Sequence, residues 1–306
     1  MSSSSSFSTV TVLGAGNLGA QIAFRAAYFG YAVTSYDIDD AALAAAAGRF
    51  DAIAEKYATD VADATQEKLA AARANITQTA DLQAAVAKAD LVIEAVPENL
   101  ELKKSIYEKI GAAAPAHTVF LTNSSSLPPS AMAESTGRPD KFMAFHFAND
   151  IHRISVVEVM PTPSTSQETY DAVAAFAPTM GMHPILLHKE QPGYIINTLL
   201  IPWLDAAAHL WVNGVADVAT VDSTAAMITG SPKFSPFRVY DTVGFGVAYA
   251  ISSQSPDPVM VKFAEVLKER VIDQGKLGVE THEGFYHYGE DGQPTGLTEA
   301  AKKPVE

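Results

Sequence analysis

Short apolar runs and helical segments alternate along the first half of the chain. Residues 9–13 are β-branched and apolar and end at a glycine, and residues 17–29 then have the composition of a helix. Residues 32–36 repeat the strand pattern, and the alanine-rich stretch 39–47 predicts a second helix. This order predicts a βαβ unit with parallel strands.

The alternation continues to about residue 160, with one interruption. Further strands are predicted at residues 91–96, 119–122, 142–147 and 155–160. Apolar side chains at every fourth position from Leu102 to Ile110 predict a helix between the first two of these strands. Residues 50–72 are polar and helical in pattern, which predicts a helical hairpin inserted into the sheet domain.

The strand pattern fades beyond Pro192. Helices are predicted at residues 194–212, 217–228 and 258–274. The domain boundary is placed near Lys189, where charge, proline and glycine interrupt the pattern. The sequence therefore predicts a doubly wound α/β domain at residues 7–189, followed by an all-α C-terminal domain at residues 190–306.

A glycine-rich turn joins the first predicted strand to the first predicted helix. It reads Gly14-Ala15-Gly16-Asn17-Leu18-Gly19. The first glycine permits a tight turn, the second lets a pyrophosphate approach the backbone, and the third lets the helix pack on the strand. The motif predicts a Rossmann-type site for NAD, contacted by Gly14, Gly16, Asn17, Leu18 and Gly19. A glycine-rich turn without a ligand is the alternative.

Asp37 follows the second predicted strand. A carboxylate there can accept hydrogen bonds from the adenosine ribose hydroxyls. Asp39 and Asp40 come next, with no arginine beside them in the sequence, so the 2′-phosphate of NADP would meet like charge. The pattern favours NAD over NADP. Alternatively, Asp37 caps the following helix.

Composition narrows the class of protein. A chain of 306 residues with 48% hydrophobic and 18% charged residues can form two folded domains. The absence of cysteine excludes disulfides and thiolate metal sites, and we expect no metal centre. A net charge of −14 disfavours nucleic-acid binding.

The serine run 1–6 does not resemble a signal peptide, and polar residues interrupt the most apolar stretch, 195–212. We therefore expect a cytoplasmic protein without a membrane span.

A histidine and a carboxylate are candidates for proton transfer. His146 closes the apolar run 142–147, and Glu158 lies in the run 155–160. If these two strands pair, the carboxylate comes beside the imidazole, fixes its tautomer and stabilises its protonated form. Such a pair would accept the proton of an alcohol as NAD takes its hydride. A purely structural histidine at a strand end is the alternative.

The residues described so far resemble the 3-hydroxyacyl-CoA dehydrogenase family over nearly the whole chain after the serine run. The resemblance also rests on residues 90–103, 123–127, 146–149, 157–159, 192–197, 235–237, 241–244 and 283–286. It implies that the pair His146 and Glu158 is catalytic, and that the C-terminal domain forms a homodimer.

The resemblance also assigns roles to other residues. It implies that Ser125 and Asn197 bind the substrate carbonyl or hydroxyl, that Asn149 helps to hold the reacting groups, and that Glu98 and Lys103 line the nicotinamide side. Simpler roles remain open. Ser125 could cap a helix, Asn197 could cap or bridge helices, and Glu98 and Lys103 could form a solvated ion pair.

The chain departs from the family pattern in the loop after the histidine motif, where Asp150, His152 and Arg153 introduce polar groups. Arg153 could pair with Asp150 or bind a substrate carboxylate. Further along, His282 stands where the family has glycine, and Gly246 stands where an aspartate is common.

The inserted segment carries two basic residues, Arg49 and Lys56. They could meet the phosphates of coenzyme A or simply be solvated.

Three functions are compatible with these observations. The first is an NAD-dependent dehydrogenase of short-chain (S)-3-hydroxyacyl-CoA, such as 3-hydroxybutyryl-CoA, in fatty acid metabolism. The second uses the same fold on a free hydroxy acid, as relatives acting on gulonate or carnitine do. The third is a non-catalytic protein that binds NAD.

Overall fold

The computed structural model describes residues 7–303 and 305 and divides the chain into two compact units. The first unit runs to Ile195 and the second begins at Ile196, beyond Lys189, where the sequence analysis placed the boundary. The serine run 1–6, interpreted above as no signal peptide, lies outside the described residues. None of the helices in the described ranges is long and apolar enough to cross a membrane.

The first unit is built on an eight-stranded sheet of order β3-β2-β1-β4-β5-β6-β7-β8. Its strands are β1 (Thr9–Leu13), β2 (Ala32–Tyr36), β3 (Ile76–Thr79), β4 (Leu91–Glu94), β5 (Val119–Thr122), β6 (Phe142–Phe147), β7 (Val156–Pro161) and β8 (His183–Leu186). Strands β6 and β7 pair antiparallel, and all other neighbours pair parallel. The strand order reverses between β1 and β4, and doubly wound sheets bind ligands at the carboxyl ends of strands at that point.

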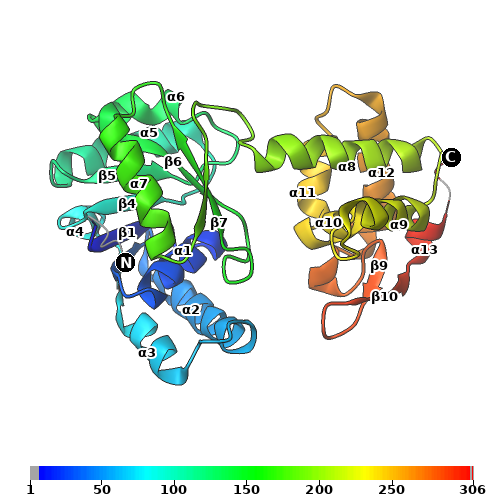
Figure 1. Ribbon diagram of the computed structural model, residues 1–306, viewed down its shortest axis with the longest axis horizontal. Coiled ribbons are helices and arrows are strands. Elements are labelled where there is room, and N and C mark those ends of the chain that lie inside the picture. The colour runs from blue at the N-terminus through cyan, green and yellow to red at the C-terminus, as the bar shows by residue number, and fades with distance from the viewer. Residues whose placement is uncertain (1–6, 304, 306) are drawn as a thin grey trace. The chain divides into compact units, whose positions relative to one another are not determined.

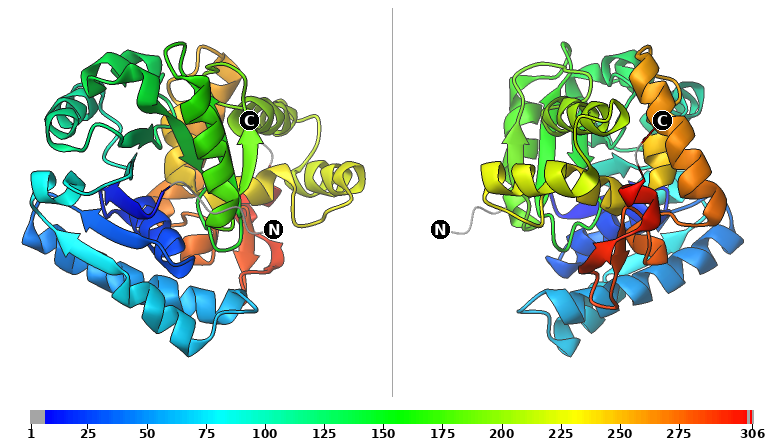
Figure 2. Two further views of the ribbon diagram at one scale, coloured as in Figure 1. Left: turned by 60° about the vertical axis from the view of Figure 1, so that its left-hand side comes forward. Right: turned by 90° about the vertical axis from the view of Figure 1, so that its right-hand side faces the viewer.

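Helices cover both faces of this sheet (Figures 1 and 2). One face packs against α1 (Asn17–Tyr28), α2 (Asp40–Asp60), α3 (Gln66–Ala74) and α7 (Gln167–Thr179). The other packs against α4 (Leu82–Val86), α5 (Leu100–Ala113) and the single turn α6 (Ser130–Ala133). Because each face buries its own apolar cluster, the predicted doubly wound α/β domain is confirmed.

The predicted helical insertion consists of α2 and α3. Helix α2 is continuous through Gly48, whereas the sequence pattern suggested two separate helical stretches there. Asp39 begins α2, since its carboxylate accepts a hydrogen bond from the Ala42 N–H at 2.8 Å. Thr65 caps α3 in the same way, through the Lys68 N–H.

The second unit is mainly helical, as predicted. Its helices are α8 (Ile196–Val212), α9 (Val218–Thr229), α10 (Pro236–Val243), α11 (Phe245–Ser252), α12 (Pro258–Arg270) and α13 (Glu299–Lys302). It also contains a two-stranded antiparallel sheet of β9 (Tyr286–Tyr288) and β10 (Pro294–Leu297), which the sequence analysis did not predict. His282 has a φ of +60°, a backbone conformation that favours glycine, which explains why the family resemblance leads one to expect glycine there.

A buried carboxylate, Asp241 on α10, joins this small sheet to the helices. Its oxygens accept hydrogen bonds from the Phe285 and Tyr286 N–H groups at 2.8 and 3.0 Å and from the Tyr288 hydroxyl at 2.8 Å. Burial raises the pKa of Asp241 to about 7, against the opposing effect of these hydrogen bonds.

The raised pKa predicts a pH-dependent stability. Between about pH 4 and pH 7 the folded state keeps a proton that the unfolded state releases, so the free energy of unfolding should fall by up to about 1.4 kcal/mol per pH unit. Asp241→Asn does not titrate. The stability advantage of the wild type over this variant, measured by urea unfolding, should therefore shrink from about pH 5 to pH 7. An advantage that stays constant over this range would show that Asp241 is already ionised in the folded state.

Candidate active site

The glycine-rich loop between β1 and α1 has the shape of a phosphate cradle. Gly14 has a φ of +91°, and a Cβ there would lie 2.6 Å from the Ala95 carbonyl oxygen. A Cβ on Gly19 would overlap with the Gly14 carbonyl, whereas Gly16 faces open space. No side chain caps the N-terminus of α1, so its N–H groups remain available to an anion. The loop therefore fits the pyrophosphate of a dinucleotide.

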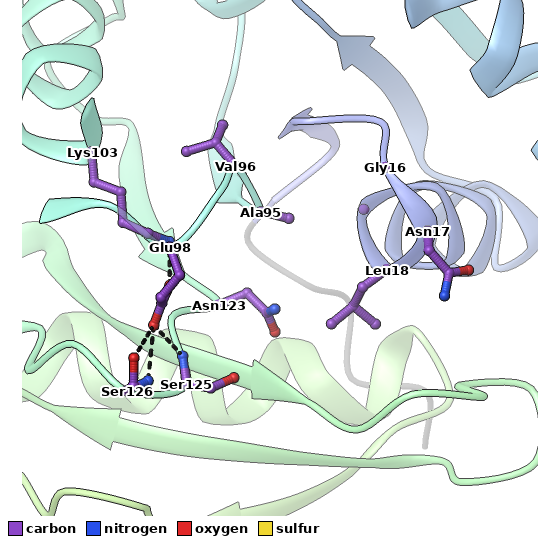
Figure 3. A pocket seen from close by; sticks show the side chains of 11 residues that line it. Gly16, Asn17, Leu18, Ala95, Val96, Glu98, Lys103, Asn123, Ser125 and Ser126 are labelled. Carbon is purple, nitrogen blue, oxygen red and sulfur yellow. Dashed lines mark hydrogen bonds and ion pairs between the residues drawn. The ribbon is translucent and has the colours of Figure 1, made fainter. Parts of the chain in front are cut away.

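A pocket of about 270 Å³ opens beside this loop. Gly16, Asn17, Leu18 and Gly19 form one side of it (Figure 3). The opposite side is formed by residues from the ends of β4 and β5 and from α5, namely Ala95, Val96, Glu98, Lys103, Asn123, Ser125 and Ser126. The structure thus brings most of the predicted cofactor residues together with Ser125.

Asp37 lies at the end of β2, against the same loop. Its carboxylate accepts hydrogen bonds from the Ala15 N–H and the Ile38 N–H, both at 2.8 Å. The alternative that Asp37 caps the next helix is wrong, because Asp39 is the N-cap of α2.

Arg49 on α2 also reaches the glycine loop. Its guanidinium donates to the Ala15 carbonyl oxygen at 3.1 Å. The sequence places no arginine beside Asp37, but the fold brings this one to the same loop residue. Lys56, the other basic candidate, is exposed further along α2.

We expect the enzyme to discriminate against NADP. Asp37, Asp39 and Asp40 would repel a 2′-phosphate, so kcat/KM with NADPH should be at least about 100-fold below that with NADH. Asp37→Ser should narrow this ratio because it removes one of the three carboxylates that repel the 2′-phosphate, while Arg49 remains at the same loop. Steady-state rates with both cofactors test this, and equal efficiencies in the wild type would contradict it.

Strands β6 and β7 place His146 directly opposite Glu158. The His146 Nδ1 and the Glu158 Oε2 are 2.9 Å apart, and the carboxylate is fully buried. The other carboxylate oxygen accepts from the Ile195 N–H at 2.8 Å, which fixes its orientation. A buried carboxylate of this kind selects the tautomer with a proton on Nδ1 and leaves Nε2 as an acceptor.

Ser125 completes a row of three side chains. Its hydroxyl lies 2.9 Å from the His146 Nε2. The capping alternative for Ser125 is wrong, because Pro129 is the N-cap of the next helix, α6. The row therefore runs from the edge of the pocket through the imidazole to Glu158.

Glu98 organises the serine loop. One of its oxygens, Oε1, accepts from the Ser124 and Ser126 hydroxyls at 2.6 and 3.0 Å. It also accepts from the N–H groups of Ser125 and Ser126 (Figure 3) and from that of Leu127. Burial acts to raise the pKa of Glu98, but these hydrogen bonds and Lys103 lower it to about 2. Glu98 is thus an anion beside the pocket.

The ion pair between Glu98 and Lys103 is not an ordinary solvated pair. The Lys103 Nζ is 3.1 Å from Glu98 and 2.7 Å from Glu94, and the lysine side chain is 1% exposed. Glu94 is fully buried and also accepts from the Thr122 hydroxyl at 2.8 Å. Glu94 was not predicted as a site residue, although a carboxylate that ends the apolar run of β4 is a visible signal in the sequence.

Two further predicted residues, Asn149 and Asn197, make no contact within the described residues that tests their predicted roles. Asn149 is exposed in the loop after β6, and it is Asn123 that binds this region, through the Phe147 N–H at 2.8 Å. Asn197 is the second residue of α8, in the second unit. The roles of Asn149 and Asn197 therefore stay predictions.

The sequence suggested Asp150 as a partner of Arg153, but the structure shows another partner. Arg153 donates from Nε and Nη2 to Asp60, at the end of α2, at 2.9 and 3.1 Å. His152 also binds this carboxylate at 2.9 Å. Asp60 thereby connects the loop after β6 to the helical insertion. The binding of a substrate carboxylate by Arg153, whose side chain is 64% exposed, stays a prediction.

The glycine loop, the pocket and the buried histidine–carboxylate pair define an oxidoreductase that uses NAD(H). Residues 9–191 match the family described as 3-hydroxyacyl-CoA dehydrogenase, NAD binding domain, and residues 193–288 match its C-terminal domain. The chain belongs to the 3-hydroxyacyl-CoA dehydrogenase family.

Individual relatives agree with this assignment. The chain is 34% identical to the mitochondrial hydroxyacyl-coenzyme A dehydrogenase of Rattus norvegicus over 91% of this chain and 90% of that protein. It is 51% identical to a diketoreductase described for substrate-directed dual catalysis of dicarbonyl compounds, with a TM-score of 0.90 over 93% of this chain and all of the other. A (S)-3-hydroxybutyryl-CoA dehydrogenase from Ralstonia eutropha is 29% identical, with a TM-score of 0.75 over 93% of this chain and all of that one.

Proposed function

We propose that the protein interconverts short-chain (S)-3-hydroxyacyl-CoA and 3-oxoacyl-CoA, with 3-hydroxybutyryl-CoA as the representative substrate. The observation that carries this proposal is the row Ser125, His146 and Glu158 at the edge of the cofactor pocket. The row combines a hydrogen-bond donor, a base and an orienting carboxylate, which oxidation of a secondary alcohol requires.

The side chains divide the work of the proposed reaction. The glycine loop and Asp37 would hold NAD, which accepts the hydride. The His146 Nε2 takes the hydroxyl proton of the substrate, and Glu158 stabilises the imidazolium that results. The Ser125 hydroxyl, within reach of the same nitrogen, orients the substrate oxygen and donates to it as negative charge develops in the reverse reaction.

A second candidate is reduction of dicarbonyl compounds or oxidation of hydroxy acids that carry no coenzyme A. The 51% identity to a diketoreductase over the whole of that chain favours it. Gulonate- or carnitine-like acids belong to this class. A non-catalytic NAD-binding protein has less support, because a scaffold would not need a serine hydroxyl aligned on the imidazole.

One assay separates these functions. NADH oxidation is followed with acetoacetyl-CoA, with acetoacetate esters and other uncharged 1,3-dicarbonyl compounds, and with free 3-oxo acids. Preference for the thioester by at least about tenfold in kcat/KM supports the first proposal. Equal or better turnover of the compounds without coenzyme A supports the second. If NADH binds and nothing turns over, the scaffold function gains support.

We further propose that the second unit forms a homodimer and that the protein is cytoplasmic, with a role in fatty acid metabolism. Exposed apolar side chains on α9 and α11 support the dimer, among them Met227 and Ile228 at 76% and 81% exposure. The mammalian relatives are named as mitochondrial, so the compartment needs its own test by fractionation. Sedimentation at micromolar concentration tests the dimer.

A further inference from the structure

Tyr194 is the residue in closest aromatic contact with the proposed base. Its ring stacks on the His146 imidazole, with centroids 4.2 Å apart and planes inclined by 11°. The Tyr194 hydroxyl donates to the Ser124 carbonyl oxygen at 2.5 Å. One side chain thus contacts both the imidazole and the backbone next to Ser125.

The backbone at Tyr194 is held in an unfavourable conformation. Its φ is +54°, in the left-handed region that bulky side chains rarely adopt. Gly193 before it has a φ of +77°. Such a conformation persists only where the surrounding structure enforces it, and such residues gather at functional sites. Here the turn directs a large side chain inward, where it is 2% exposed.

We propose that Tyr194 is a positioning residue that keeps Ser125 aligned on the imidazole of His146. The stacked ring fixes the plane of the imidazole, which Glu158 anchors only at Nδ1. The hydroxyl fixes the Ser124 carbonyl, and Glu98 holds the Ser124 side chain at 2.6 Å. This inference rests on the proposed role of His146 as the base.

Two variants separate the ring from the hydroxyl. Tyr194→Phe keeps the stack and loses the bond to Ser124, so kcat should fall by about three- to tenfold. Tyr194→Leu loses both and should lower kcat by about 100-fold. The dissociation constant for NADH, measured by fluorescence, should change by less than about twofold in both.

A control variant tests whether loss of stability alone explains the effect. Tyr57 is a buried tyrosine of the same unit, whose ring packs on Phe24 and Tyr28. Tyr57→Leu should lower the melting temperature about as much as Tyr194→Leu, with kcat within about twofold of the wild type. If Tyr57→Leu lowers kcat as much as Tyr194→Leu does, the positioning role is wrong.

A double-mutant cycle tests the path through Ser125. In a Ser125→Ala background the alignment no longer matters, so Tyr194→Phe should change kcat by less than about twofold. The same three- to tenfold loss in that background would overturn the inference. In the same assays, turnover that survives His146→Gln would refute the proposed function itself, whereas an inactive His146→Gln beside a fully active Tyr194→Leu would refute only the role of Tyr194.

Discussion

Replacing His146 with glutamine is expected to lower kcat by about 10³-fold, because general acid–base catalysis contributes about 10²- to 10⁴-fold and glutamine cannot exchange a proton. The glutamine amide can still bond to Glu158, so the fold around β6 and β7 should persist. Affinity for NADH should stay within about twofold, since the glycine loop is unchanged. Stopped-flow reduction with the best substrate found above, combined with NADH titration, measures both quantities.

His152 provides a matched control for this variant. It follows six residues later, its side chain is 5% exposed, and it binds Asp60 instead of the row of three. His152→Gln should therefore leave kcat within about twofold of the wild type. Retention of more than about a tenth of the wild-type kcat by His146→Gln would remove this histidine from the chemistry.

The sheet could be predicted where strands are buried on both faces. Strands β1, β4 and β5 consist mostly of apolar and β-branched residues because helices cover them on each side. Strands β3 and β8 were not predicted. Both lie at edges of the sheet; only Ile76 of β3 is buried, and β8 contains Pro184. An edge strand pairs with another strand along one edge only, so fewer of its side chains are buried and its apolar pattern is weak.

The candidate site could be predicted where a local pattern carries it. The pairing of His146 with Glu158 followed from two adjacent apolar strands, whose register fixes the contact. The partner of Arg153 could not be predicted, because Asp60 is 93 residues away in the sequence. Tyr194 was likewise missed, since only its unusual φ and the folded chain bring it onto the imidazole.

Glu158→Gln is expected to reduce kcat by about 10²- to 10⁴-fold, although glutamine and glutamate have nearly the same volume. Both oxygens of the wild-type carboxylate accept a hydrogen bond, one from the His146 Nδ1–H and the other from the Ile195 N–H. The amide can accept at only one position. If its NH₂ group faces the ring, Nδ1 becomes the acceptor and the proton moves to Nε2, the atom that must act as base. If its oxygen faces the ring, the tautomer is right, but the Ile195 N–H meets an NH₂ group and the imidazolium lacks a counter-charge.

Combining the two substitutions tests whether His146 and Glu158 act as a unit. When histidine and carboxylate act as a unit, the double variant His146→Gln/Glu158→Gln should be no slower than His146→Gln alone, within about threefold. Glu190→Gln is the control, because this carboxylate binds the Ser130 N–H and hydroxyl outside the row and should affect kcat by less than about twofold. Multiplicative losses in the double variant would mean that Glu158 stabilises the fold or the substrate independently of the imidazole, and that its contact with Nδ1 is not what makes His146 a base.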